Sequence, residues 1–190
     1  MEKRPELYFP EACEWRDWLL RHHDSTPNGV YLIFFKLETE IPTMRWEEAV
    51  RVALCFGWID STVKSLGNGK RRQYFCPRNP KSSWSQLNKT YIEELEREGQ
   101  IHSSGQAIIR QAKKNGAWNE LDAVENGIIP PELQNAFDKN PIAWQHYQSF
   151  APSYQKSYLY WLHGAKRPAT RERRIDEIIR LCRDNEKSRS

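Results

Sequence analysis

The sequence lacks the features that mark several large classes of protein. Its longest uncharged apolar run extends only from Val30 to Phe35, whereas roughly 20 consecutive apolar residues are needed to cross a bilayer. Residues 1–10 contain no apolar segment of the kind that forms a signal peptide. We therefore expect a cytoplasmic protein with no membrane-spanning segment.

Motifs of common catalytic and metal-binding sites are also missing. The chain has four cysteines, but no pair shows a CxxC spacing, and without an export signal a disulfide framework is not expected. The GxGxxG, P-loop, GxSxG and HExxH patterns do not occur. Cys55 lies beside a predicted apolar helix stripe, where burial would raise the pKa of its thiol and leave it inert. We expect neither a metal site nor a cofactor.

Basic residues are concentrated in the middle of the chain. The formal net charge is only +4, yet residues 61–92 hold a run of basic residues and no acidic one. The basic residues of this run are Lys64, Lys70, Arg71, Arg72, Arg78, Lys81 and Lys89. One interpretation is a solvated face that aids solubility. The other is an anion-binding surface, because the same stretch contains aromatic rings, and cations with rings suit phosphates and bases together.

Hydrophobic periodicity predicts an α+β fold. Strands are predicted near residues 30–36, 58–66 and 71–76, with a hairpin turn at residues 67–69. Apolar residues at helical spacing lie before and after these strands. We therefore expect a small antiparallel sheet of about three strands, packed by helices.

The C-terminal part of the sequence is predicted to be entirely helical. Residues 117–131 look irregular, because Gly127 and the Pro130–Pro131 pair interrupt regular structure. Every later segment shows helical spacing of apolar residues. We predict two domains, an α+β region at 1–126 and an all-helical region at 127–190.

Three helices are predicted to begin at hydroxyl caps. Ser83 with Gln86, and Ser103 with Gln106, fit the capping box, in which the serine hydroxyl accepts an orphan backbone N–H. Thr170 is the predicted cap of the last helix. The first of these caps would bring the start of its helix close to the preceding cations.

Two distant strings in the sequence resemble one protein family. The first is ALCFGWIDS at residues 53–61, followed by SWSxxN at residues 83–88. The second is AKR at residues 165–167, followed by TRxRRI at residues 170–175. Together they resemble the bacterial YdeI/OmpD-associated family, also called bacteriocin-protection proteins, with an OmdA-like helical C-terminal region. The resemblance implies a fold type and a theme of protection against antimicrobial peptides, but no reaction.

The cationic stretch and the first string define a candidate ligand-binding site. Arg78, Ser85 and Asn88 offer donors to an anion, and the N-terminus of the predicted helix adds free N–H groups and partial positive charge. Two tryptophans either pack in the core or wall the pocket. The candidate ligand-binding residues are Trp58, Asp60, Arg72, Arg78, Trp84, Ser85 and Asn88. A carboxylate, a phosphate or a nucleic-acid backbone suits this chemistry.

Asp60 has two interpretations at the sequence level. It is either a general base or an ion-pair partner of Arg72 or Arg78. Pairing would order the hairpin through charge-assisted hydrogen bonds, and the carboxylate would then stay ionised and be a poor proton acceptor. The pairing interpretation is the stronger one, because an acid that precedes a wholly basic stretch will find a partner.

A second group of basic residues opens the last helix. Cations at a helix N-terminus oppose the helix dipole, so something should compensate them. Compensation comes either from acidic residues of the chain or from an anionic ligand or partner. The candidate residues of this C-terminal basic group are Lys166, Arg167, Arg171 and Arg174.

These observations favour a non-enzymatic binding module whose cationic face engages an unknown anionic ligand or protein partner. One alternative is an enzyme that acts on a small carboxylated or phosphorylated substrate through Asp60, Arg78 and Asn88. The other alternative is a nucleic-acid-binding protein that uses the basic hairpin. A steep fall in affinity with rising salt would favour nucleic-acid binding over the binding module and the enzyme, because phosphate contacts release bound counterions.

Overall fold

The computed structural model describes residues 4–188. The chain divides between Glu120 and Leu121 into two compact units, here called unit 1 and unit 2; the boundary predicted from the sequence lies at 126/127. Unit 1 contains a sheet packed by helices, and unit 2 contains helices alone. The predicted α+β class, with a helical C-terminal part, is confirmed.

The sheet of unit 1 has four strands in the order β1-β2-β4-β3. The strands are β1 (Glu6–Tyr8), β2 (Val30–Phe35), β3 (Trp58–Gly67) and β4 (Lys70–Pro77). The two hairpin strands pair antiparallel and β4 pairs antiparallel with β2, whereas β1 runs parallel to β2. Three strands lie where the sequence predicts them. The short strand β1 was not predicted.

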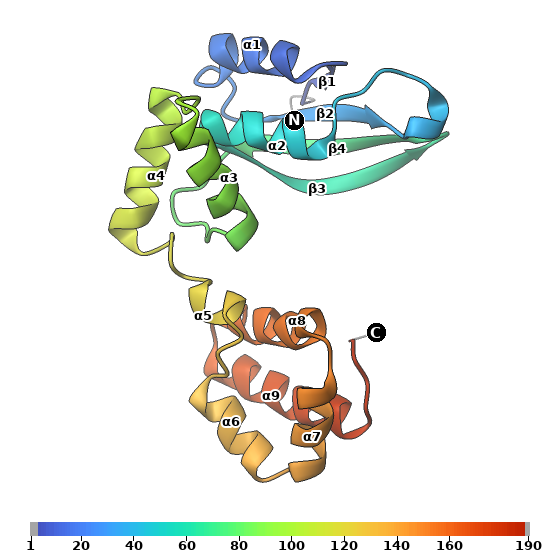
Figure 1. Cartoon of the computed structure of the whole chain (residues 1–190), viewed down its shortest axis with the longest axis vertical. Helices are drawn as coiled ribbons and strands as arrows, with labels where there is room; N and C mark the ends of the chain where they lie inside the picture. The colour runs from blue at the N-terminus through green and yellow to red at the C-terminus, as the bar shows by residue number, and fades with distance from the viewer. Residues whose placement is uncertain (1–3, 189–190) are drawn as a thin grey trace. The chain divides into compact units, whose positions relative to one another are not determined.

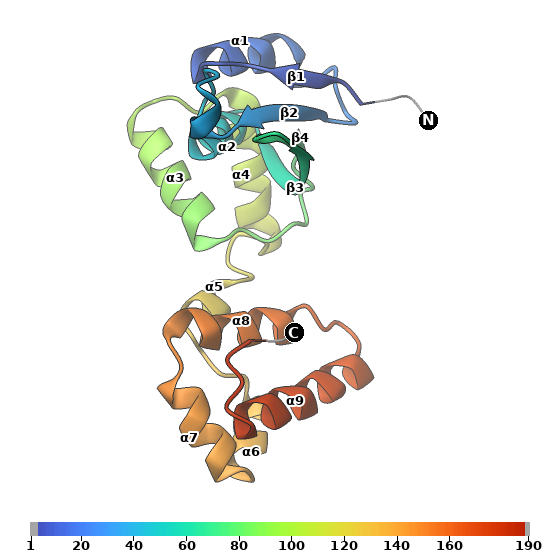
Figure 2. The ribbon, with the colours of Figure 1, turned by 90° about the vertical axis from the view of Figure 1, so that its right-hand side faces the viewer.

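Helices cover one face of this sheet. They are α1 (Ala12–His22), α2 (Trp46–Cys55), α3 (Gln86–Arg97) and α4 (Ser103–Asn115), and a single 3-10 turn, η1, spans Leu37–Thr39. Val30, Leu32 and Phe34 of β2 project into the core on this side. Figure 1 shows α2 lying against the strands, and Figure 2 shows α2 and α3 on the same side of the sheet.

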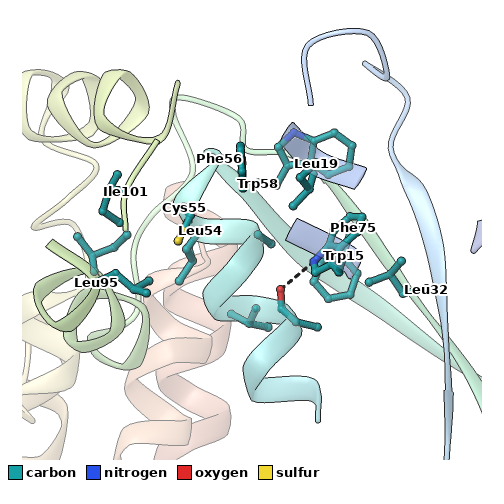
Figure 3. Packing of buried hydrophobic residues seen from close by; sticks show 14 of the residues in the cluster. Trp15, Leu19, Leu32, Leu54, Cys55, Phe56, Trp58, Phe75, Leu95 and Ile101 are labelled. Carbon is teal, nitrogen blue, oxygen red and sulfur yellow. Dashed lines mark hydrogen bonds between the residues drawn. The ribbon is translucent and has the colours of Figure 1, made fainter. Parts of the chain in front are cut away.

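Tryptophan rings dominate the core of unit 1 (Figure 3). Trp15 of α1 is fully buried, and its ring meets the rings of Trp58 and Phe75 edge to face. Its indole Nε1–H donates to the carbonyl oxygen of Ala49 in α2, at 3.2 Å. This ring therefore joins both helices to the sheet, and its one polar group is satisfied.

The helix starts differ from the capping predictions. The N-cap of α3 is Ser85, whose hydroxyl accepts from the backbone N–H of Asn88, so Ser83 lies outside the helix. At α4 the N-cap is His102, and Ser103 is the first helical residue. The last helix follows Arg167, so the prediction of a Thr170 cap was wrong.

Unit 2 is a small helical bundle. Its helices are α5 (Asp122–Glu125), α6 (Pro131–Asp138), α7 (Pro141–Ser149), α8 (Pro152–His163) and α9 (Pro168–Arg183). Four of them start with a proline at the first turn, where the missing N–H costs no hydrogen bond. Leu133, Phe137, Leu162 and Ile178 are fully buried at its centre.

Two general absences apply to residues 4–188. No helix in this range combines the length and the apolar character that a bilayer crossing demands. No group of three or more histidine, cysteine, aspartate or glutamate side chains gathers there in a way that could hold a metal ion.

Candidate functional site

A groove of about 900 Å³ opens where the β3–β4 hairpin ends. One wall is the tip of the hairpin, and the other is the segment 36–47, which contains η1 and the first turn of α2. The walls are joined at one end, because the backbone N–H of Lys36 donates to the carbonyl oxygen of Gly69 at 2.8 Å. Gly69 has φ +70°, and a Cβ there would lie 2.4 Å from Thr39. Glycine is therefore needed for this approach.

The groove has an apolar floor and a basic rim. Phe34, Met44 and Trp46 are among the apolar residues that line it. The charged residues that line it are the basic Lys36, Arg45, Lys70 and Arg71 and the acidic Glu38 and Glu47. An apolar hollow with a few convergent polar groups is the usual form of a small-molecule site.

Arg71 is the best-positioned cation of the groove. Its guanidinium lies 5.3 Å from the ring centroid of Phe34, with which it is paired across β4 and β2. Within residues 4–188, the four basic residues of the groove form no ion pair with an acidic side chain. Their charge is therefore not neutralised by a bonded carboxylate, and the groove favours an anion.

Asp60 lies beside the groove rather than in it. Its carboxylate accepts from the Nε1–H of Trp46 at 3.0 Å and from the side-chain amide of Gln73. Both donors are neutral, so the ion pair with Arg72 or Arg78 that the sequence favours does not form. Because Trp46 also lines the groove, Asp60 acts as an anchor for that wall.

Arg78 is a buried cation against the core. It is 5% exposed, and its guanidinium carbon lies 3.8 Å from the ring centroid of Trp84. Nη2 donates to the carbonyl oxygen of Ser83 at 2.5 Å, whereas Nε and Nη1 are buried without a partner within residues 4–188. Burial lowers the pKa of Arg78 to about 10, and the nearby charge of Asp60 opposes this shift.

The remaining predicted residues near Arg78 serve the fold. Trp84 is 1% exposed and packs against Trp118, with ring centroids 4.9 Å apart. Ser85 caps α3 through its bond with the N–H of Asn88. Trp58 is equally buried, and its Nε1–H donates to the carbonyl oxygen of His23 at 3.1 Å. The structure thus brings Arg78, Trp84, Ser85 and Asn88 together, but it places Trp58 elsewhere in the core.

Arg72 lies on the opposite face of the sheet from Arg71. Alternate residues of a strand project to opposite faces, so Arg71 and Arg72 do not serve one site. The guanidinium of Arg72 forms an ion pair with Glu6 at 2.6 Å and lies 4.4 Å from the ring centroid of Tyr31. The seven predicted residues are therefore distributed over two faces of the sheet.

The C-terminal basic group is occupied largely by contacts within unit 2. Arg171 pairs with Glu132 of α6 at 2.5 Å and also donates to the carbonyl oxygen of Leu162. Arg174 donates to the carbonyl oxygen of Trp161, and its guanidinium lies 5.0 Å from that ring. Lys166 and Arg167 lie in the exposed connection before α9. For Arg171 and Arg174, the chain itself supplies the compensation that a helix start requires.

One wall of the groove was not predicted from the sequence. Residues 36–47 carry no recognised motif, and their role arises from the contact between Lys36 and Gly69, which are distant in the sequence. Lys70 and Arg71, on the other wall, belong to the basic run at residues 61–92, for which an anion-binding surface is one of the two interpretations. The period-two alternation of a strand is the signal that could have separated Arg71 from Arg72.

Together, a helix-covered sheet with a basic groove and a following helical bundle define a two-unit α+β protein without a recognised catalytic constellation among residues 4–188. Residues 7–108, more than half of the chain, match a family model described as a domain of unknown function, DUF8412. Residues 126–185 match the OmdA model, described as "Bacteriocin-protection, YdeI or OmpD-Associated". By the first model the chain belongs to the DUF8412 family, and its residues 126–185 carry the OmdA domain of the YdeI/OmpD-associated family.

One curated relative is similar to about half of the chain. It is the uncharacterized protein YdeI of Bacillus subtilis (strain 168), which is 33% identical over 102 residues. This match covers 52% of the present chain and 50% of the relative, so the chain spans about half the length of the relative it matches. No solved structure matches the chain.

Proposed function

We propose that the protein is a non-enzymatic binding module whose groove takes a small anionic ligand with an apolar part. The observation that carries this proposal is Arg71, a cation that has no acidic partner among the described residues 4–188 and lies at the apolar floor of the groove. A carboxylate or phosphate bound to this guanidinium gains a charge-assisted hydrogen bond. The apolar part of the ligand would be buried against Met44 and Trp46.

The description of the matched family names bacteriocin protection. We propose that ligand binding in the groove contributes to such protection.

The enzyme alternative receives less support. It needs Asp60, Arg78 and Asn88 in one pocket, yet none of the three lines the groove. Asp60 is engaged by two donors, and Arg78 is buried against Trp84. A binding role agrees better with this geometry.

The test is a thermal-shift panel on the full chain at low salt. The probes are inorganic phosphate, nucleoside monophosphates, sugar phosphates and aromatic carboxylates. A ligand that binds only the native state raises the melting temperature. We expect at least one probe with both an anionic group and an apolar group to stabilise the protein, and inorganic phosphate alone to do so least.

Variants then locate the binding. Arg71→Glu is expected to weaken a stabilising probe by about tenfold or more, because it removes the charge-assisted bond and adds a repulsive charge. Lys114→Glu is the matched control, since Lys114 is an exposed residue of α4 outside the groove. The groove would not be an anion site if no probe raised the melting temperature, or if Arg71→Glu and Lys114→Glu lowered the affinity for a stabilising probe equally.

A further inference from the structure

The face of the sheet opposite the helices carries its own set of rings and cations. Antiparallel partners share a face, so Tyr31 and Tyr74 lie side by side, as do Ile33 and Arg72. The side chains that belong to this face by register are Glu6, Tyr8, Tyr31, Ile33, Phe35, Ile59, Lys64, Lys70, Arg72, Tyr74 and Cys76. We call this surface the open face. The members of the hydrophobic core cluster in β2 and β4, namely Val30, Leu32, Phe34 and Phe75, lie on the other side, and Ile33 is buried on the open face itself.

Two arginine–tyrosine stacks form the centre of the open face. The guanidinium of Arg4 lies 4.7 Å from the ring centroid of Tyr74, and that of Arg72 lies 4.4 Å from the ring centroid of Tyr31. The two tyrosine rings are 5.4 Å apart between centroids. The two tyrosine rings and the two guanidinium groups therefore lie next to one another, and the paired strands β2 and β4 hold the rings at a fixed spacing.

Hydrogen bonds fix this arrangement before any ligand arrives. The hydroxyl of Tyr74 donates to the carbonyl oxygen of Asn28 at 2.7 Å, and Nε of Arg4 donates to the same oxygen at 3.1 Å. Arg72 is held by its ion pair with Glu6. Immobilised rings and guanidinium groups lose little conformational entropy when a ligand binds, so the surface is preorganised.

The charge of the open face is positive. Arg4 lies over Tyr74 on this face, Lys64 and Arg72 belong to it by register, and Glu6 is its one acidic member within residues 4–188. Lys64 is directly opposite Arg72 across β3 and β4. Arg72 is paired with Glu6, whereas Lys64 forms no ion pair within residues 4–188, so its charge is available to an anion. A polyanion with planar groups along its length is complementary to this surface in both charge and shape.

We propose that the open face binds single-stranded nucleic acid. Bases would stack on the Tyr31 and Tyr74 positions, either on the rings or on the guanidinium planes that cover them. Phosphates would lie against Arg4, Lys64 and Arg72. A duplex keeps its bases stacked inside the helix and exposes only its backbone. It would therefore contact the basic side chains of the open face but could not stack on the two tyrosine rings. Phe35 and Lys70, at the hairpin tip, also line the groove, whereas Tyr31, Arg72 and Tyr74 do not, so the inference rests on residues outside the groove.

The experiment measures fluorescence anisotropy of a labelled single strand of about 10 nucleotides, as RNA and as DNA, with the full chain. We expect binding at about 50 mM salt that weakens on raising the salt, with a slope of about −2 in log affinity against log salt, for roughly three phosphate contacts. The same sequence as a duplex should bind more weakly. Comparison of the RNA and DNA probes shows which backbone the surface prefers.

Variants separate stacking from charge. Tyr31→Leu with Tyr74→Leu is expected to weaken binding by about tenfold or more with little change in salt slope, because stacking is lost and phosphate contacts remain. Arg72→Glu should weaken binding and flatten the salt dependence. Lys114→Glu on α4 makes the same change in net charge away from the sheet, and it should alter affinity less than about twofold.

Chemical-shift mapping on the unaltered protein covers the case in which the double tyrosine variant fails to fold. Shifts on adding the RNA probe should concentrate at Tyr31, Arg72 and Tyr74. The proposal is overturned by absence of binding at about 50 mM salt, by a duplex that binds as tightly as the single strand, or by shifts confined to other surfaces. Loss of oligonucleotide binding leaves the groove proposal standing, since that proposal depends on Arg71 and on small ligands.

Discussion

The basic residues of the groove in unit 1 and those of α9 in unit 2 differ in whether the chain supplies them with acidic partners. In unit 2, Arg171 pairs with Glu132, Arg174 donates to the carbonyl oxygen of Trp161, and Arg180 pairs with Glu177 and Asp184. In unit 1, the basic residues of the groove have no ion-pair partner within residues 4–188. Similar local charge in the sequence therefore gives two different surfaces.

The difference arises from where acidic residues lie relative to each basic residue. Glu177 and Asp184 lie within one helical turn of Arg180, where opposite charges meet readily. Residues 61–92 offer no acid at any spacing, and the strands place successive cations on opposite faces. The comparison teaches that the position of acids, rather than the number of bases, decides where positive charge is available for a ligand.

The largest expected effects come from truncating the two cores, which share no residue. Trp15→Ala in unit 1 and Phe137→Ala in unit 2 each remove a fully buried ring. Each should lower the free energy of unfolding of its own unit by about 3–5 kcal/mol. Native-state hydrogen exchange on the full chain measures this unit by unit.

A double variant sharpens that test. Because the two residues lie in separate clusters, the losses in Trp15→Ala and Phe137→Ala should add within about 0.5 kcal/mol. A larger departure from additivity, or loss of protection in both units after a single truncation, would show that the two cores do not unfold separately.

An intermediate effect is expected from charge reversal in each unit. Arg171→Glu replaces an ion pair with Glu132 by repulsion, so unit 2 should lose about 1 kcal/mol of stability, as is typical of partly exposed pairs. Arg71→Glu breaks no ion pair and should change the stability of unit 1 by less than this. Urea denaturation of both variants checks the order.

Ligand binding should show the reverse order. Arg71→Glu is expected to weaken binding of the stabilising probes by about tenfold or more, whereas Arg171→Glu should leave their binding unchanged. If Arg171→Glu also weakened their binding, the distinction between available and engaged charge would fail.

Much of the fold follows from local patterns in the sequence. The run Val30–Phe35 and the glycines of the hairpin turn predict β2, β3 and β4, because strand composition and turn chemistry act over a few residues. Strand β1 could not be found in this way. It has three residues, and it exists through parallel pairing with β2 across an intervening helix, a contact that no local pattern encodes.

The helix caps show a similar limit. Ser83 and Ser85 both satisfy the local requirement for a cap, and the choice of Ser85 depends on tertiary contacts. The carbonyl oxygen of Ser83 is engaged by Arg78, whose guanidinium lies on Trp84. Packing therefore set the first residue of α3, and the same packing buried Arg78, which the sequence analysis had expected to face a ligand.

The smallest predicted effect concerns the cap of α4. Burial, together with the nearby His23 and Arg16, lowers the pKa of His102 below its usual 6.5. The unfolded state therefore binds more protons in the range between the folded and unfolded pKa values, and stability is lost as pH falls through that range. His102→Asn keeps a side chain that can cap the helix but cannot be protonated, so unit 1 of this variant should lose less stability between about pH 7.5 and about pH 5.5.

Urea denaturation at several pH values, followed in unit 1, measures this difference. The control is His22→Asn, which removes a neighbouring histidine that caps no helix and should leave the pH dependence near that of the unaltered protein. The cap geometry gives the reason for the contrast. The Nδ1 of His102 must accept the backbone N–H of Ser104, and a protonated ring has no free lone pair with which to do so. Equal pH slopes in the His102→Asn variant and the unaltered protein would mean that protonation of this ring does not open the start of α4.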